Sequence, residues 1–314
     1  MSKGQSIVNL MHELWQMPEY QLYHDLRGLD ISIYTFHRNY ITVDSLLTFL
    51  TSDERADFLF IVKNHDKLVE VGKEIVCALH NYVAAAQSLI DHSRIMYNKL
   101  YLPAQQFPEY QERVTTEFAQ DPLAQFVKCL RQYCQHYKAP NIDVQTTYPH
   151  GFNARPMRKV RLALSDLLTF DGWNATAKKY LQTVVEAVDI QQVATEYRDK
   201  VMAFYQWVQA RQDEIHADEI KRFRAKEAEL QLLKVVDRID SYFAFASYRQ
   251  RPKHEVFLGI LPSEDVDQLE RVALAPHEQA QLAIRLLEQY FPLSNEIQTQ
   301  ILRLYQEPST ASRK

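Results

Sequence analysis

The sequence predicts a mostly α-helical protein, in which a helical bundle carries a small β-hairpin insertion and is followed by a second helical subdomain. Apolar residues make up 46% of the chain and charged residues 24%, which is typical of a globular protein. Only 6 of the 314 residues are glycine, and none lies between Gly72 and Gly151 or between Gly172 and Gly259. Because sheets and tight turns need glycine for positive φ angles, gaps of this length favour helices. Apolar residues also recur at helical spacing over long stretches.

The same composition excludes some classes of function. A chain with these glycine gaps has no room for the glycine-rich loops that hold nucleotide phosphates, so we expect no P-loop, no dinucleotide-binding fold and no cofactor. A net charge of -4 excludes a globally basic nucleic-acid binder but allows a local basic patch. The N-terminus is too polar for a signal peptide, and no apolar run approaches the roughly 18 residues that span a membrane. We therefore expect a cytoplasmic protein with no membrane segment.

The three cysteines are too few for a disulfide scaffold. Cys129 and Cys134 have a C-x4-C spacing on one expected helix, but no second pair completes a zinc site. We expect no metal site and interpret these two residues, together with Cys77, as buried thiols.

Residues 1–60 form an N-terminal segment with a mixed pattern. Residues 7–15 have the spacing of a short amphipathic helix. Residues 31–36 (Ile-Ser-Ile-Tyr-Thr-Phe) alternate and are rich in β-branched side chains, which predicts a short strand. Residues 46–50 and the chain from Asp53 onward are again predicted to be helical.

The strongest periodic pattern lies within residues 61–140, which we interpret as a helical bundle. Residues 66–101 are predicted to form one long helix, because apolar or small residues recur along it at spacings of three and four. This stripe consists of Leu68, Gly72, Ile75, Leu79, Tyr82, Ala86, Leu89, Ser93, Met96 and Leu100. Two prolines then interrupt the chain, and residues 109–118 form a short helix.

A well-marked helix follows at Asp121. Aspartate is a favoured N-cap, and Pro122 occupies the first helical position, where its missing N–H has no consequence. The expected core stripe of this helix is Leu123, Phe126, Val127, Leu130, Cys134 and Tyr137. Pro140 is expected to end the helix, because proline disfavours the helical conformation of the residue before it.

Residues 141–172 are predicted to form a β-hairpin and a connector. The arms at residues 144–148 and 160–164 flank a turn-like stretch at residues 149–156. A cationic cluster lies on and beside the second arm: Arg155, Arg158, Lys159 and Arg161. These side chains could hold an RNA backbone through phosphate contacts. The alternative is an ordinary solvated hairpin face.

Residues 173–314 are expected to return to helix. Asn174 is a candidate N-cap, and Asp189 with Gln192 resembles a capping box. Residues 213–229 are charged on most faces, as expected of a solvated or partner-facing helix. Three terminal helices are expected to start at Ser263, Pro276 and Ser294, followed by a frayed tail at residues 308–314.

One short segment carries a resemblance. Residues 126–140 read Phe-Val-Lys-Cys-Leu-Arg-Gln-Tyr-Cys-Gln-His-Tyr-Lys-Ala-Pro, and they contain Arg131 and His136 at an R-x4-H spacing. This segment resembles the R-x4–6-H signature of the HEPN superfamily of helical-bundle proteins, with Leu130, Tyr133 and Pro140 as supporting context. The resemblance extends over about residues 60–140.

The resemblance implies a function and a set of site residues. Active members of the superfamily are metal-independent ribonucleases of toxin–antitoxin and antiviral systems, and they are usually dimeric. It implies that Arg131 and His136 are the catalytic pair, with Gln132 at a position where a shorter polar residue is common. It also implies an RNA substrate, a homodimer, and an antitoxin or defence-system partner protein.

The residue types suit this chemistry. Cleavage of RNA through its own 2′-OH needs a group that moves protons near neutral pH, which histidine does without adjustment of its pKa. It also needs a fixed cation beside the phosphate, and a guanidinium group binds phosphate oxygens in a fork. An Arg and a His five residues apart also occur as ordinary boundary residues of a helix, so this alternative stays open.

Helical geometry restricts how the pair could act. Five residues of α-helix turn through about 500°, so Arg131 and His136 would point about 140° apart. Convergence on one phosphate needs either a distorted last turn, which Pro140 favours, or two motifs that meet across a dimer axis. Possible supporting residues on the preceding long helix are Asp91, His92 and Arg94, which could line the same cleft or simply form a polar helix face.

Two hypotheses of function follow. The first is a HEPN-like ribonuclease that uses His136 for proton transfer and Arg131 for phosphate binding. The second is a non-catalytic helical interaction or regulatory protein that partners another gene product, in which the charged helix at residues 213–229 is the important surface.

Overall fold

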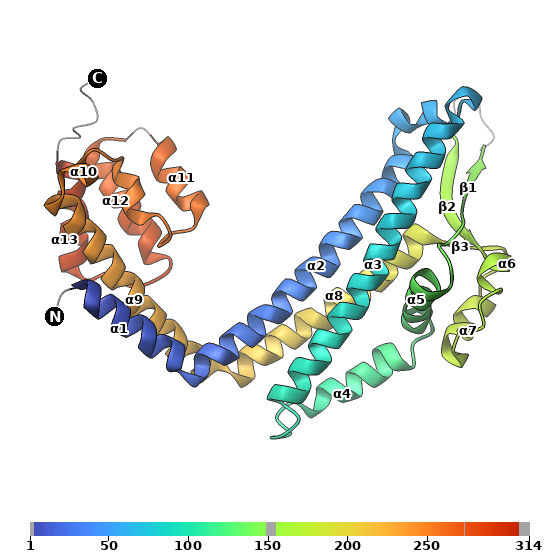
Figure 1. Cartoon of the computed structure of the whole chain (residues 1–314), viewed down its shortest axis with the longest axis horizontal. Helices are drawn as coiled ribbons and strands as arrows, with labels where there is room; N and C mark the ends of the chain where they lie inside the picture. Colours follow the sequence, from blue (N-terminus) through green and yellow to red (C-terminus); the bar gives the residue numbers. More distant parts are fainter. Residues whose placement is uncertain (1–2, 149–154, 273, 308–314) are drawn as a thin grey trace. The chain divides into compact units, whose positions relative to one another are not determined.

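The computed structural model describes residues 3–148, 155–272 and 274–307 (Figure 1). Within them the protein is mostly helical with one small three-stranded antiparallel sheet, which confirms the predicted fold class. The chain divides into two compact units, one formed by residues 24–215 and the other by residues 1–23 together with 216–314. This division differs from the four consecutive segments expected from the sequence. No helix in the described ranges combines the length and apolar character needed to cross a membrane.

The unit of residues 24–215 is built on long helices and a small sheet that share one core. Its α-helices are α2 (Pro18–Ser52, of which residues 18–23 are counted with the other unit), α3 (His65–Leu100), α4 (Pro108–Val114), α5 (Pro122–Gln132), α6 (Leu164–Leu167), α7 (Ala175–Gln182) and α8 (Ile190–Ile215). Short 3-10 turns at Glu54–Phe60 and Val62–Asn64 join α2 to α3, and π turns follow α4 (Thr115–Ala119) and α5 (Tyr133–Tyr137). Figure 1 shows α2, α3 and α8 running alongside one another.

The strand predicted at residues 31–36 is wrong, because this stretch is part of α2. Ile33 and Phe36 belong to a longer stripe with helical spacing, whereas Ile31 and Thr35 are exposed. The buried residues of this stripe are Leu29, Ile33, Phe36, Tyr40, Val43, Leu47 and Leu50. Burial of this stripe outweighs the intrinsic preference of isoleucine and threonine for strands. The phenyl ring of Phe36 stacks on Tyr82 of α3 with 5.4 Å between ring centroids.

The long helix predicted for residues 66–101 is confirmed as α3. It runs antiparallel to α2, since Lys99 Nζ lies 2.6 Å from Asp25 Oδ2 and Ser32 Oγ lies 2.8 Å from His92 Nδ1. The buried phenol of Tyr82 donates a hydrogen bond of 2.9 Å to the carbonyl oxygen of Ala194 on α8. Aromatic packing and this buried bond therefore join α2, α3 and α8 into one body.

The capping signals of α5 are confirmed. Asp121 accepts a hydrogen bond of 2.8 Å from the Ala124 backbone N–H, and Pro122 is the first helical residue. The α-helical part ends at Gln132, earlier than Pro140 alone would suggest, and the chain then widens into the π turn Tyr133–Tyr137. This turn is closed by a hydrogen bond of 3.1 Å from Lys138 N to Tyr133 O.

The predicted hairpin is confirmed by β1 (Ile142–Thr147) and β2 (Met157–Ala163), which pair antiparallel. Its predicted turn at residues 149–156 lies mostly outside the described residues. A third strand, β3 (Ala187–Asp189), pairs with the other edge of β2 to give the order β1-β2-β3. The sequence did not predict β3, because three residues are too few to show an alternating pattern.

Two further N-caps agree with the sequence. Asn174 accepts a hydrogen bond of 2.8 Å from the Ala177 backbone N–H at the start of α7. Asp189 accepts from the backbone N–H groups of Gln191 and Gln192 at the start of α8. The side chain of Gln192 bonds Glu196, so the observed cap is formed by the aspartate.

The second unit is helical throughout its regular structure. It contains α1 (Lys3–Gln16), α9 (Ala217–Ala244), α10 (Ala246–Arg249), a 3-10 turn (Lys253–Phe257), α11 (Ser263–Arg271), α12 (Pro276–Glu288) and α13 (Asn295–Gln306). The three helix starts predicted at Ser263, Pro276 and Ser294 are confirmed to within one residue. The expected frayed tail at residues 308–314 lies outside the described residues.

The charged stretch at residues 213–229 is only partly solvated. Its α9 portion packs on α1, where Leu10 and Leu14 meet Phe223 and Leu230 in a small apolar cluster. Lys226 of α9 pairs with Glu13 of α1 at 2.9 Å, so part of the charge is satisfied inside the unit. The sequence alone did not show which helix would cover this face.

Candidate functional site

Arg131 and His136 lie at the C-terminal end of α5. Arg131 is half-buried in the last α-helical turn, whereas His136 is exposed on the π turn. Three of the five residue steps that separate them fall in the wider π turn. Because each step there advances the chain by a smaller angle than in an α-helix, the two side chains are separated by less than the ~140° expected of a regular helix.

The guanidinium of Arg131 has no acidic partner in the described part of the chain. Its Nε atom is buried and donates no hydrogen bond there. His136 likewise forms no hydrogen bond or ion pair with the described residues. An uncompensated, half-buried guanidinium is unfavourable by itself and is stabilised by an anion.

One carboxylate holds both ends of the π turn. Asp166 of α6 accepts a hydrogen bond from the Tyr133 phenol at 2.8 Å and one from Lys138 Nζ at 2.5 Å. The bond from Lys138 lowers the pKa of Asp166, and the bond from Tyr133 acts in the same direction against partial burial. Tyr133 is fully buried, and burial raises the pKa of its phenol. Tyr133 is therefore a positioning residue for the turn. Gln132, the residue before it in the chain, is half-buried.

The three possible supporting residues on α3 have partners of their own. Arg94 pairs with Asp91 at 3.1 Å, and His92 bonds Ser32 of α2. Arg94 also lines a cavity of about 260 Å³ that reaches α5 at Gln125 and at Lys128, one helical turn before Arg131. The π turn that follows α5 contributes Cys134 to a second cavity.

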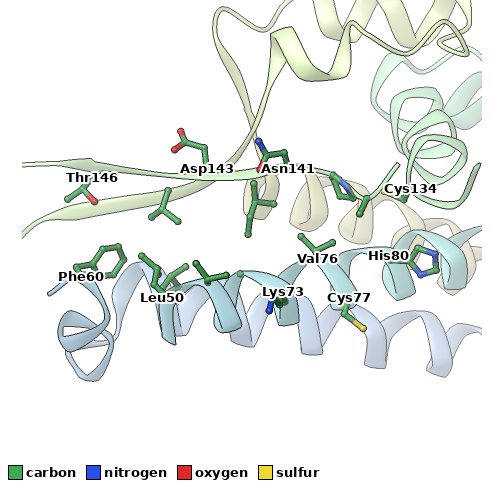
Figure 2. A pocket seen from close by; sticks show the side chains of 17 residues that line it. Leu50, Phe60, Lys73, Val76, Cys77, His80, Cys134, Asn141, Asp143 and Thr146 are labelled. Carbon is green, nitrogen blue, oxygen red and sulfur yellow. The ribbon is translucent and has the colours of Figure 1, made fainter. Parts of the chain in front are cut away.

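A larger cavity of about 780 Å³ lies between α3 and β1 (Figure 2). Cys134 of the π turn shares it with Cys77 and His80 of α3. His92 is twelve residues beyond His80, or about 18 Å along the helix axis. The supporting role of Asp91, His92 and Arg94 stays a prediction, and Arg94 is the one of the three that shares a cavity with α5.

The lining of this cavity is mainly apolar. In Figure 2, Thr146, Asp143 and Asn141 on the β1 side lie across the gap from Lys73 and Val76 of α3. The apolar lining residues are Leu50, Phe60, Leu68, Val69, Val76, Ala139, Pro140, Ile142 and Val144. Sequence reasoning did not identify this site, because its two walls come from segments about seventy residues apart and their patterns differ in period.

Each cation of the hairpin cluster has an acidic partner. Arg155 pairs with Glu54, Arg158 with Asp57 at 2.7 Å, Lys159 with Asp189 at 3.1 Å, and Arg161 with Asp143 at 2.6 Å. The guanidinium of Arg158 also stacks on the Phe60 ring at 3.9 Å, and its side chain is only 7% exposed. The RNA-binding role of the cluster stays a prediction, and it would require these pairs to be exchanged for phosphate contacts.

The cysteines are free thiols. Cys129 and Cys134 are buried as predicted, and burial raises the pKa of Cys134 to about 12. Cys77 is exposed, so its predicted burial is wrong; it lies on α3 outside the buried stripe. No group of three or more His, Cys, Asp and Glu side chains suited to a metal ion occurs in the part of the chain that the structure describes.

In comparisons with known proteins, the chain matches no protein-family model, no curated protein and no solved structure.

Proposed function

We propose that the protein is a metal-independent endoribonuclease of the HEPN type, with His136 as the proton-transfer group and Arg131 as the phosphate-binding residue. In this proposal it acts on RNA in the cytoplasm as a homodimer, in a toxin–antitoxin or antiviral defence context with a protein partner. The observation that carries the proposal is the half-buried guanidinium of Arg131, which has no acidic partner in the described ranges and is followed five residues later by the exposed imidazole of His136.

The contrast with the hairpin supports this assignment. All four cations of the hairpin cluster are paired with carboxylates, whereas Arg131 keeps its charge available for an anion. A phosphodiester supplies two oxygens that match the guanidinium fork.

The π turn supports the proposal in a second way. Single π turns in helices are rare and occur frequently at functional sites. This one begins two residues after Arg131, carries His136 and reduces the angle between the two side chains. Asp166 bonds the side chains of Tyr133 and Lys138 at its two ends. A second copy placed around a two-fold axis would bring a second Arg131 and His136 beside the first pair.

The proposed reaction is an internal transesterification. The 2′-oxygen of the RNA bonds to phosphorus while its proton passes to His136, and the bond between phosphorus and O5′ breaks. The leaving O5′ takes a proton from solvent, and His136 releases its proton to solvent. The products are a 2′,3′-cyclic phosphate and a 5′-hydroxyl end, and Arg131 binds the charge that develops on the phosphoryl oxygens.

The test is incubation of the full chain with total RNA and with tRNA in EDTA, followed by analysis of the product ends. We expect cleavage with cyclic phosphate ends by the wild type and none by His136→Ala or Arg131→Ala. His65→Ala and Arg38→Ala are matched controls, because both residues are exposed on helices of the same unit. Cleavage that persists in both motif variants would contradict the assignment.

A non-catalytic interaction protein is the second candidate function. It is favoured by the hairpin, because the paired cations there leave no free basic surface for RNA among the four predicted residues. Under this alternative, purified protein cleaves no RNA and both motif variants behave as the wild type.

A further inference from the structure

The cavity between α3 and β1 has the form of a long groove. Its α3 wall extends from Leu68 to His80, about 18 Å at the rise of an α-helix. Its β1 wall extends from Asn141 to Thr146, about 17 Å at the rise of a strand. Two walls of matching length define a site for an elongated ligand, and a volume of about 780 Å³ is within the range of ligand-binding cavities.

One wall of the groove is an open strand edge. The strand order β1-β2-β3 makes β1 an edge strand that pairs only with β2. No backbone hydrogen bond reaches its other edge from any residue that the structure describes. Every second residue of β1 therefore has a backbone N–H and a C=O group without a backbone partner on this edge. Another extended chain is the structure that can form hydrogen bonds with all of these groups at once.

β1 lacks the usual features that keep an edge strand from pairing. Its sequence, Ile-Asp-Val-Gln-Thr-Thr, contains no lysine and no proline. Its six residues pair with β2 without a gap, so it has no bulge. Its one charge, Asp143, is held by Arg161 of β2 at 2.6 Å.

The side chains of β1 determine what the groove would accept. Ile142 and Val144 lie on one face of the strand, opposite Leu162 and Val160 of β2, and both line the cavity. A strand added to the free edge of β1 would project every second side chain toward the same face, above Val69 and the neighbouring apolar residues of α3. Such side chains must be apolar to match this lining.

We propose that the groove binds an extended segment of another protein, which adds as a fourth strand to β1 and buries apolar side chains at alternate positions against α3. The backbone edge supplies the hydrogen bonds, and the groove supplies selectivity for alternating apolar residues. This inference concerns a different surface from the Arg131 and His136 pair and does not depend on RNA cleavage.

The experiment uses a fluorescein-labelled, acetylated peptide of about eight residues that alternates valine and threonine. Titration with the full chain should raise its fluorescence anisotropy in a saturable way. Two N-methylated versions test the geometry, each methylated at one alternate set of residues. Since only one edge of the added strand faces β1, we expect one version to lose binding and the other to bind like the parent.

Two variants locate the binding. Val69→Arg places a charged side chain at the groove, and we expect it to weaken binding by about tenfold or more. Val62→Arg is the matched control, because Val62 is 92% exposed and lies outside the groove, and it should bind like the wild type.

Three outcomes would overturn the inference. The first is no saturable binding of the parent peptide. The second is equal binding of both N-methylated versions, which would mean that the groove takes apolar groups without strand pairing. The third is self-association that is lost in Val69→Arg while no peptide binds, which would make a second copy of this chain the occupant.

Discussion

Tyr133 donates its phenolic proton to Asp166 at 2.8 Å, while the other oxygen of Asp166 accepts from Lys138 at 2.5 Å. Tyr133 and Lys138 are also the two residues whose backbone hydrogen bond closes the π turn. One carboxylate of α6 therefore holds both ends of the turn that carries His136.

Replacement of Tyr133 by phenylalanine tests the importance of this link. We expect Tyr133→Phe to lower the free energy of unfolding by about 1.5–3 kcal/mol, because a buried hydrogen bond to a charged acceptor is lost. Urea denaturation measures the change. Tyr290→Phe is the control, because Tyr290 makes a bond of the same chemistry to Asp265 at an exposed site, and it should lower the stability by clearly less than Tyr133→Phe does. Equal losses in the two variants would show that the Tyr133 bond has no special role.

The stability that Asp166 contributes to the fold is expected to depend on pH. The pKa of Asp166 is below its ordinary value of 3.8 in the folded chain, chiefly because Lys138 donates to it. A carboxyl group with a lowered pKa stabilises the fold above its unfolded pKa, and this stability is lost as the pH falls through the folded pKa. We therefore expect the stability difference between the wild type and Asp166→Asn to shrink as the pH falls from about 5 to about 2. Denaturant titrations across this range measure it, and a constant difference would contradict the account.

The N-cap of α5 at Asp121 gives a third prediction about stability. Asp121 accepts from the Ala124 N–H and also pairs with Lys200 of α8 at 3.1 Å. We expect Asp121→Ala to lower the free energy of unfolding by about 0.5–2 kcal/mol, and Asp121→Asn to recover most of the loss, since asparagine caps equally well. If Asp121→Asn is as unstable as Asp121→Ala, the ion pair with Lys200 rather than the cap is the important contact.

Much of the fold follows from local patterns in the sequence. The period of α3 and the caps at Asp121 and Asn174 were sufficient to place these elements. Residues 31–36 were misassigned because a six-residue window shows β-branched side chains but hides the longer stripe of α2. The π turn has no sequence signal of this kind, since it depends on the distant contact with Asp166.

The site was harder to predict than the fold. The motif pair Arg131 and His136 could be identified from its spacing in the sequence. Other features depend on which distant segments meet in space, for example the pairing of Arg158 with Asp57 and the groove opposite Val69.

The hairpin cations make a prediction about RNA affinity. For single-stranded RNA, each phosphate contact contributes about -0.7 to the slope of log affinity against log salt. A double variant, Arg155→Ala with Lys159→Ala, would therefore reduce the slope by about 1.4 if both side chains bind phosphate. Because both side chains are paired with carboxylates, we expect the slope to change by less than the roughly 0.7 expected for one phosphate contact. Filter binding over a salt series measures it, and a full two-contact change would restore the cluster as an RNA-binding surface.

The rate of RNA cleavage in EDTA measures whether Arg131 and His136 act together on a phosphodiester. We expect His136→Ala to lower this rate by about 100-fold or more, and Arg131→Lys to lower it markedly, because lysine keeps the charge but not the fork. His65→Ala should cleave at the wild-type rate. Wild-type protein that cleaves no RNA, or a His136→Ala variant that cleaves as fast as His65→Ala, would contradict the account.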